Sequence, residues 1–244
     1  MSETGYTPLG LAQRTREAVA QRGARPVIGD LARWGTGVAT GLPWVARGHH
    51  GSFAFQGHRH GYLYRPYKQP WMTERAVEVP VTQRIIAAHA GQRILEVGHV
   101  LGHYGPVDHV VVDKYEHAPG VHNLDVLELA PLGEFDLIVA ISTLEHVGWD
   151  EAPRAPDKAV EAVTALRARL APGGRLVLTV PMGYNPWFDA ALRSGQIPLR
   201  DAAALRQSRL GPHWREVATD EVWSAPYDFL LYRARGVLVA FLAA

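Results

Sequence analysis

From Gln92 onward, short apolar runs alternate with a segment whose apolar positions recur every three or four residues. The runs are rich in Val, Ile and Leu and end at glycine or acidic residues, which is typical of buried strands. We expect strands at Arg93–Val97, His109–Asp113, Asn123–Val126, Phe135–Ile141 and Arg175–Val180. A helix is expected at Asp157–Leu170, because its apolar residues share one face. This alternation predicts an α/β protein with a doubly wound, mostly parallel sheet.

The two ends of the chain follow other patterns. Near the start, we expect a helix at Pro8–Gln21, a loosely helical stretch at Ala24–Gly48, a hairpin formed by Ser52–Gln56 and His60–Arg65, and a helix at Thr73–Ala90 with a bend at Pro80. Near the end, we expect a short helix at Leu199–Gln207 and two closing strands at His213–Val217 and Val237–Leu242, which could pair antiparallel. The chain is thus divided into an N-terminal helical and hairpin extension, residues 1–91, and a core, residues 92–244.

Two connections between predicted parallel strands are unusually short. Only the stretch from Gly98 to His109 separates the first two strands, although a parallel crossover usually needs a dozen or more residues, most of them helical. The second connection, Lys114–His122, contains Pro119 and Gly120. Because a parallel sheet is buried on both faces, another part of the chain must cover the face that these crossovers leave open. We expect the N-terminal extension to pack there and to help build the pocket.

The amino-acid composition argues against several classes of function. The 25 Lys and Arg against 24 Asp and Glu give a net charge of +1, which argues against nucleic-acid binding. The absence of cysteine excludes disulfides and thiolate metal sites. No apolar tract is long enough to span a bilayer. The first fifteen residues lack the basic start and apolar core of a secretory signal, so we expect a cytoplasmic protein without a membrane partner.

Acidic residues and glycines meet at the predicted carboxyl edge of the sheet. Glu96 and Asp113 end the first two strands, and Gly98 and Gly102 follow the first. This is how a doubly wound sheet presents an adenosine-type ligand, whose ribose hydroxyls an acid such as Asp113 can bind. Val100 stands where a dinucleotide motif has its second glycine, and no Lys or Arg lies between Gly98 and Asp113 to meet phosphates. The sequence favours an adenosine ligand without phosphate.

Five segments in order resemble the class I S-adenosylmethionine-dependent methyltransferases: EVGHVLG at Glu96–Gly102, VVVDKYE at Val110–Glu116, NLDVLEL at Asn123–Leu129, FDLIVAISTLEHV at Phe135–Val147 and LAPGGRLVLTVP at Leu170–Pro181. The short first crossover is similar to that of a poorly described bacterial subgroup. The resemblance implies a seven-stranded sheet of methyltransferase type and S-adenosylmethionine as the cofactor. It implies that Glu96 supports the methionine amino group, Asp113 the ribose and Asp125 the adenine. The full set of implied cofactor residues is Glu96, Gly98, His99, Gly102, Asp113, Lys114, Asp125, Val126, Ser142 and Thr143.

Two residues after the fourth strand are candidates for catalysis. His146 is the best candidate for a general base, since its ordinary pKa near 6.5 lets it take a proton from a hydroxyl at neutral pH. Glu145 beside it is the second candidate. The alternative is that His146 only caps the following segment and orients the loop.

We predict no metal site. Relatives with a Glu-x-x-Glu-His pattern in this loop bind a divalent metal, but Ser142 stands at the first of these positions. His99 and His103 are four residues apart and can share a helical face, where contact with cofactor or substrate is favoured over a metal. The remaining histidine cluster, His49, His50, His58 and His60, is interpreted as surface residues.

The sequence therefore predicts a methyltransferase that acts on a small-molecule acceptor. A histidine base favours an oxygen acceptor, as in a sugar, a glycolipid precursor or a secondary metabolite. Two alternatives stay open: a catalytically silent adenosine-binding or scaffold protein on the same fold, and a nicotinamide-dependent oxidoreductase. A homodimer is compatible with the sequence, which does not fix the oligomeric state.

Overall fold

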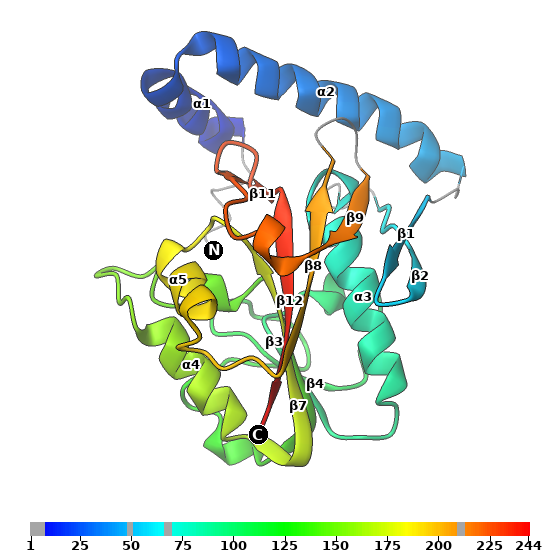
Figure 1. Ribbon diagram of the computed structural model, residues 1–244, viewed down its shortest axis with the longest axis vertical. Helices are drawn as coiled ribbons and strands as arrows, with labels where there is room; N and C mark the ends of the chain where they lie inside the picture. The colour runs from blue at the N-terminus through cyan, green and yellow to red at the C-terminus, as the bar shows by residue number, and fades with distance from the viewer. Residues whose placement is uncertain (1–7, 48–50, 66–69, 209–212) are drawn as a thin grey trace.

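The computed structural model describes residues 8–47, 51–65, 70–208 and 213–244. Its centre is an eight-stranded sheet in the order β5-β4-β3-β6-β7-β12-β8-β9 (Figure 1). The bounds are β3 Ile94–Val97, β4 Val110–Val112, β5 Val121–His122, β6 Phe135–Ile141, β7 Leu170–Pro181, β8 Asp201–Gln207, β9 Trp214–Val217 and β12 Gly236–Ala243. The strands β5, β4, β3, β6 and β7 pair in parallel, whereas β12 pairs antiparallel with β7 and β8, and β9 pairs antiparallel with β8. The predicted doubly wound, mostly parallel sheet is confirmed, and β8 is added to the seven expected strands.

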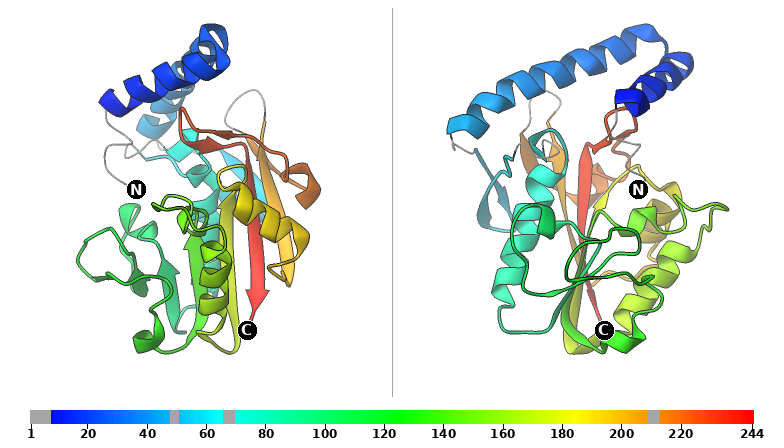
Figure 2. Two further views of the ribbon diagram at one scale, coloured as in Figure 1. Left: turned by 90° about the vertical axis from the view of Figure 1, so that its left-hand side faces the viewer. Right: turned by 180° about the vertical axis from the view of Figure 1, so that it is seen from behind.

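Helices cover the sheet on both faces (Figure 2). On one face, α4 (Lys158–Arg167) and α5 (Pro186–Ser194) bury Leu166 and Phe188 against Ile138 and Leu178. The opposite face is covered by α3 (Arg75–Ala88) together with the hairpin of β1 (Ser52–Phe55) and β2 (His58–Gly61). The hairpin turns at Gln56 and Gly57, which both have positive φ. Both faces of the parallel sheet are thereby kept from water, as such sheets require.

The two short crossovers are as the sequence predicts. The first contains one 3-10 turn, η3 (Leu101–His103), and the second contains no helix. Val77 and Val81 of α3 instead pack with Leu137 and Val139 on the face that longer crossover helices would cover. The N-terminal part of the chain therefore shares the main core with the sheet, as we expected, whereas the division at residue 91 stays a prediction.

The expected helix at Leu199–Gln207 is wrong. These residues form β8, which lies between β12 and β9, so the two closing strands do not pair with each other. The helix was expected because Pro198 just before it is a helix start signal, and the run Ala202–Ala203–Ala204 also has high helix propensity. Small side chains also suit a strand packed on both faces, and the pairing with β12 decides the outcome.

Two further segments differ from expectation. The third strand is β5 at Val121–His122, so the expected strand Asn123–Val126 is wrong in position. The stretch expected to be loosely helical is a continuous helix, α2 (Ala24–Arg47), which follows α1 (Pro8–Arg22). Pro26 lies in its first turn, where a missing N–H costs no hydrogen bond.

The helices α1 and α2 lie above the carboxyl edge of the parallel strands (Figures 1 and 2). Ala18 and Val27 pack there against Leu230, in the loop between β10 (Tyr227–Asp228) and β11 (Arg233–Ala234). Among the described residues, no helix combines the length and the apolar character needed to cross a bilayer.

Candidate functional site

The site begins at a sharp turn at the end of β6. Ser142 has a positive φ of 41°, and its N–H donates to Thr179 O at 2.9 Å. Its hydroxyl donates to Glu78 of α3. A non-glycine residue in this conformation is strained, so surrounding contacts must hold it there. The turn sends the next residues into η5 (Leu144–His146) above the carboxyl edge.

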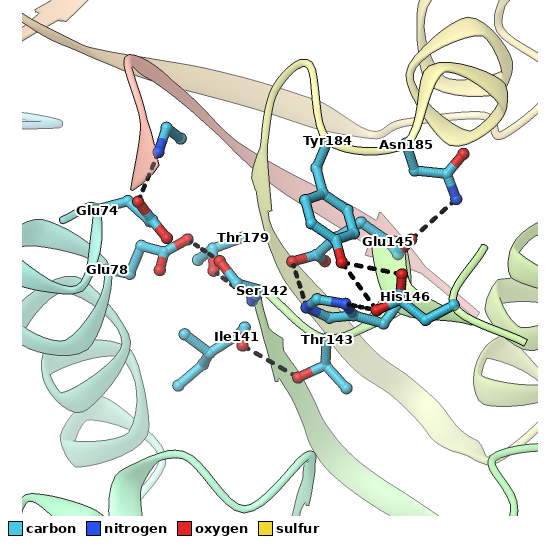
Figure 3. A network of polar contacts seen from close by, with 12 residues as sticks. Glu74, Glu78, Ile141, Ser142, Thr143, Glu145, His146, Thr179, Tyr184 and Asn185 are labelled. Atoms are coloured by element: carbon cyan, nitrogen blue, oxygen red, sulfur yellow. Dashed lines mark hydrogen bonds and ion pairs between the residues drawn. The ribbon is translucent and has the colours of Figure 1, made fainter. Parts of the chain in front are cut away.

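His146 lies beside Tyr184 and Glu145 (Figure 3), and its contact with Asp150 forms the polar centre of the site. His146 Nδ1 lies 2.7 Å from Asp150 Oδ2, and the Tyr184 hydroxyl donates to both oxygens of Asp150 at 2.8 and 2.9 Å. Burial acts to raise the pKa of Asp150, but its hydrogen bond with His146 and the charge of that residue keep the pKa below its ordinary value. The carboxylate therefore stays ionised and holds the proton of His146 on Nδ1. His146 Nε2 is left to act as a proton acceptor.

Glu145 is buried beside this pair. Its two carboxyl oxygens have no hydrogen-bond partner among the described residues, and Oε1 lies 3.7 Å from His146 Nε2. Burial raises the pKa of Glu145 well above its ordinary value, and the charge of Glu78 adds to the effect. Burial therefore opposes the ionisation of Glu145, because an isolated buried carboxylate is costly.

Asn185 fixes the position of this loop against α5. Its side-chain N–H donates to Glu145 O at 2.9 Å, while its Oδ1 caps the helix by accepting from Trp187 N and Phe188 N. An Asn at this position satisfies donors that the first turn of a helix leaves open. The same residue thus starts α5 and anchors the residue before His146.

Aromatic side chains line one side of the site. The ring of Tyr184 meets His146 edge-on with centroids 4.6 Å apart, and it also contacts Tyr227 and Phe229. Phe229 is 47% exposed, whereas Tyr184 is buried, so the Phe229 ring is the part of this group most open to solvent. Of the aromatic residues that follow β7, Phe188 belongs to the core instead.

Glu96 is fully buried and bound to its own loop. Its Oε1 accepts from Val100 N and Leu101 N at 2.9 and 2.8 Å, and its Oε2 pairs with His109 Nε2 at 2.8 Å. The carboxylate thus shapes the turn after β3. Its expected contact with a methionine amino group stays a prediction.

Asp113 joins two loops at the tip of β4. Its Oδ2 accepts from His99 N at 3.0 Å, and its Oδ1 accepts from Tyr115 N and Glu116 N at 2.9 and 2.8 Å. A carboxylate oxygen has two lone pairs, so Oδ2 retains capacity for a hydroxyl donor such as a ribose. Asp113 therefore fits the expected role, in addition to its structural one.

The two glycines expected at the cofactor site, Gly98 and Gly102, differ in how much room they leave for a ligand. Gly98 has φ +87°, and a Cβ there would collide with Thr143, so the backbone passes close to the residues after β6. The imidazole of His99, however, lies over Gly102, so a Cβ added at Gly102 would collide with His99 Nε2. The donor set fits an adenosyl ligand provided that this ring turns away from Gly102.

Two lysines surround Asp125, the residue expected to contact adenine. Asp125 pairs with Lys114 at 2.8 Å and lies 3.6 Å from Lys158, and Leu127 N donates to it. Burial acts to raise the pKa of Asp125, but the Lys114 hydrogen bond brings it below its ordinary value. Val126 is buried next to it. An adenine amine would compete with these lysines for the carboxylate.

Ser142, Thr143, Glu145 and His146 lie on the turn after β6, where Glu78, Asp150 and Tyr184 contact them, and their expected roles stay a prediction. The spacing of four between His146 and Asp150 was the available signal for Asp150. His58 and His60 lie on the hairpin, with His60 buried against Phe53, which contradicts a surface position for His60. His49 and His50 lie outside the described residues.

No protein-family model and no curated protein matches the sequence. Among solved structures, the chain is similar to an S-adenosylmethionine-dependent methyltransferase of Thermotoga maritima, with TM-score 0.41, 13% identity and coverage of 66% of this chain and 86% of that one. It is also similar to the sugar N-methyltransferase KedS8 of Streptoalloteichus, with TM-score 0.37, 15% identity and coverage of 80% and 98%. The third is the N-methyltransferase NodS of Bradyrhizobium japonicum, with TM-score 0.36, 17% identity and coverage of 65% of this chain and 81% of that one. Since these superpositions are partial and the identities low, the function proposed below depends on the residues of this chain.

Proposed function

We propose that the protein is an S-adenosylmethionine-dependent methyltransferase that methylates a hydroxyl of a small molecule. The observation that carries the proposal is the pairing of His146 with Asp150 at 2.7 Å, at the sheet edge that also presents Asp113. A base held by a carboxylate at this edge suits the removal of a proton from an acceptor. Gly98, Asp113 and Asp125 would hold the cofactor, which supplies a methyl group activated by its sulfonium.

His146 would take the acceptor proton on Nε2. Asp150 keeps the other ring nitrogen protonated and stabilises the imidazolium that forms. The raised pKa of Glu145 matters here, because a negative charge on this buried carboxyl would raise the cost of a deprotonated acceptor oxygen nearby. The burial of Glu145 therefore favours the reaction.

The aromatic residues beside the site indicate the chemical class of the acceptor. The exposed Phe229 and the half-buried Tyr227 pack against the buried ring of Tyr184, which contacts His146. Such surfaces suit a ring with one apolar face and several hydroxyls, as in a sugar or a hydroxylated secondary metabolite. The acceptor proposed here is of this kind.

The second candidate is a silent adenosine-binding protein on the same fold. The observation in its favour is His99, which lies over Gly102. Calorimetric titration with S-adenosylmethionine and S-adenosylhomocysteine tests the first step. A methyl-transfer assay on hydroxylated acceptors, with wild type and His146→Ala, then separates the two functions. Binding without transfer to any acceptor favours the silent protein, and no binding below about millimolar rejects both.

A further inference from the structure

Three side chains with metal-ligating atoms meet away from His146. His99 Nδ1 lies 2.8 Å and His103 Nε2 lies 3.0 Å from Glu116 Oε1. The two imidazole centroids are 4.9 Å apart. One ligand atom from each of the three residues lies within 4.8 Å of the others. The side chains are partly exposed, so an ion can reach them from solvent.

The backbone around this cluster is fixed before any ion arrives. Asp113 accepts from His99 N through one oxygen and from Glu116 N through the other. Asn123 Nδ2 donates to Glu116 O at 2.9 Å. These hydrogen bonds hold the ligand-bearing loops at a set separation. Such supporting contacts are what orient the ligands in metal sites.

The distances suit a small divalent ion. Ligand atoms bound tetrahedrally at about 2.0–2.2 Å lie roughly 3.3–3.5 Å apart. The His99–Glu116 and His103–Glu116 pairs therefore need to open by less than about 1 Å, which side-chain rotation supplies. The protons that each imidazole now shares with Glu116 would leave as the ion enters, because the ligands bind metal in their deprotonated forms.

The donor set decides the class of ion. Two imidazole nitrogens and one carboxylate oxygen suit Zn²⁺ and its neighbours among the transition metals, whereas Mg²⁺ and Ca²⁺ prefer oxygen ligands. We propose that His99, His103 and Glu116 bind one divalent transition-metal ion of the Zn²⁺ class, with a coordination position left open to solvent or a ligand.

The spacing of His99 and His103 alone did not favour a metal, because two ligands are too few. Glu116 is the third, and only the packing of the loop after β4 against η3 brings it within reach. None of its ligands contacts His146 or Asp150 in the described interactions, although His99 lies over Gly102 of the proposed cofactor site.

The test uses the full chain after treatment with a chelator. Titration with Co²⁺, as a spectroscopic substitute for Zn²⁺, is followed by visible absorption, and titration with Zn²⁺ by calorimetry. We expect one ion per chain. His103→Ala and Glu116→Gln should weaken binding by more than about 100-fold, since even the loss of a supporting contact costs roughly 10–100-fold. His213→Ala, an exposed histidine beside β9 at the other sheet edge, should bind as wild type does.

Two results would overturn the metal site. One is wild-type protein that binds neither ion below about millimolar. The other is equal binding by wild type, His103→Ala and Glu116→Gln, which would place the ion at other histidines. Circular dichroism of each variant confirms that it folds. Because the titrations contain no S-adenosylmethionine, they can fail while the methyltransferase proposal survives, and the reverse also holds.

Discussion

His146 Nδ1 lies 2.7 Å from Asp150 Oδ2, and the two residues are joined by a loop that leaves the 3-10 turn η5. The contact fixes which nitrogen of His146 carries the proton. The other nitrogen is then directed to the edge of the sheet where an acceptor would lie. The most direct test of the proposed chemistry is therefore a change at Asp150.

Asp150→Asn should lower kcat for methyl transfer by about 10²-fold or more, because a positioned general base contributes roughly 10²–10⁴-fold. The amide keeps the shape of the side chain but cannot stabilise the imidazolium. Affinity for S-adenosylhomocysteine, measured by calorimetry, should stay as in wild type. Steady-state kinetics with unchanged kcat would show that the pair only shapes the loop.

Asp113→Ala should weaken cofactor binding by about 1–3 kcal/mol, as expected when hydrogen bonds to a charged group are lost. The same change removes the contact that joins His99 to Glu116. Calorimetry with S-adenosylhomocysteine gives the affinity, and Asp108→Ala, an exposed acid nearby, is the control. Equal affinity in the two variants would remove Asp113 from the cofactor site.

Glu74→Gln should reduce the pH dependence of stability. Burial, with the charge of Glu78, raises the pKa of Glu74 from 4.5 to about 7. As pH rises, Glu74 therefore loses its proton at a lower pH in the unfolded chain than in the folded protein. The stability that neutral Glu74 contributes is fully present below about pH 4.5 and is lost as pH rises through 7.

For that variant, urea unfolding at pH 5 and pH 8 is the measurement. Wild type should lose more free energy of unfolding over this interval than Glu74→Gln, by at most about 3 kcal/mol. The exposed Glu128→Gln should behave as wild type. A variant as sensitive to pH as wild type would mean that Glu74 is ionised in the folded protein.

Leu230→Ala should loosen α1 and α2 from the sheet edge. Leu230 is buried against Ala18 and Val27, and its carbonyl accepts from Arg14 Nε at 3.3 Å. Removal of a buried leucine side chain costs about 2–5 kcal/mol. Hydrogen exchange should become faster in both helices, while Ile28→Ala, an exposed position on α2, should leave it unchanged. Equal exchange in the two variants would contradict this anchoring role.

The sequence was sufficient to predict an element where the local pattern and the tertiary contacts favour the same structure. The runs before Gly98 and Asp113 are apolar and end at turn residues, and they became β3 and β4. It was insufficient at Ala202–Gln207, because helix propensity pointed one way and pairing with β12 the other. Patterns of single segments carry no information on which strand lies next to them.

The same limit applies to the site. His146 could be predicted because it follows an apolar run that ends in the sheet. Asp150 required knowledge that the chain turns back after η5, and Glu78 required the docking of α3 against β6. Glu116 joined His99 and His103 only through the closeness of two loops. The contacts of Glu78 and Glu116 join separate elements, so residue spacing does not reveal them, whereas the spacing of four between His146 and Asp150 was compatible with their contact.

Asp113 has one further consequence. Its carboxylate already spans the gap between two loops, so a nucleoside that engages it must share it with amides of the chain. An ion on His99 and Glu116 would join the same loops a second time and keep the imidazole over Gly102. Metal and nucleoside would then oppose each other through one local equilibrium, and by reciprocity each would lower the affinity of the other by the same factor.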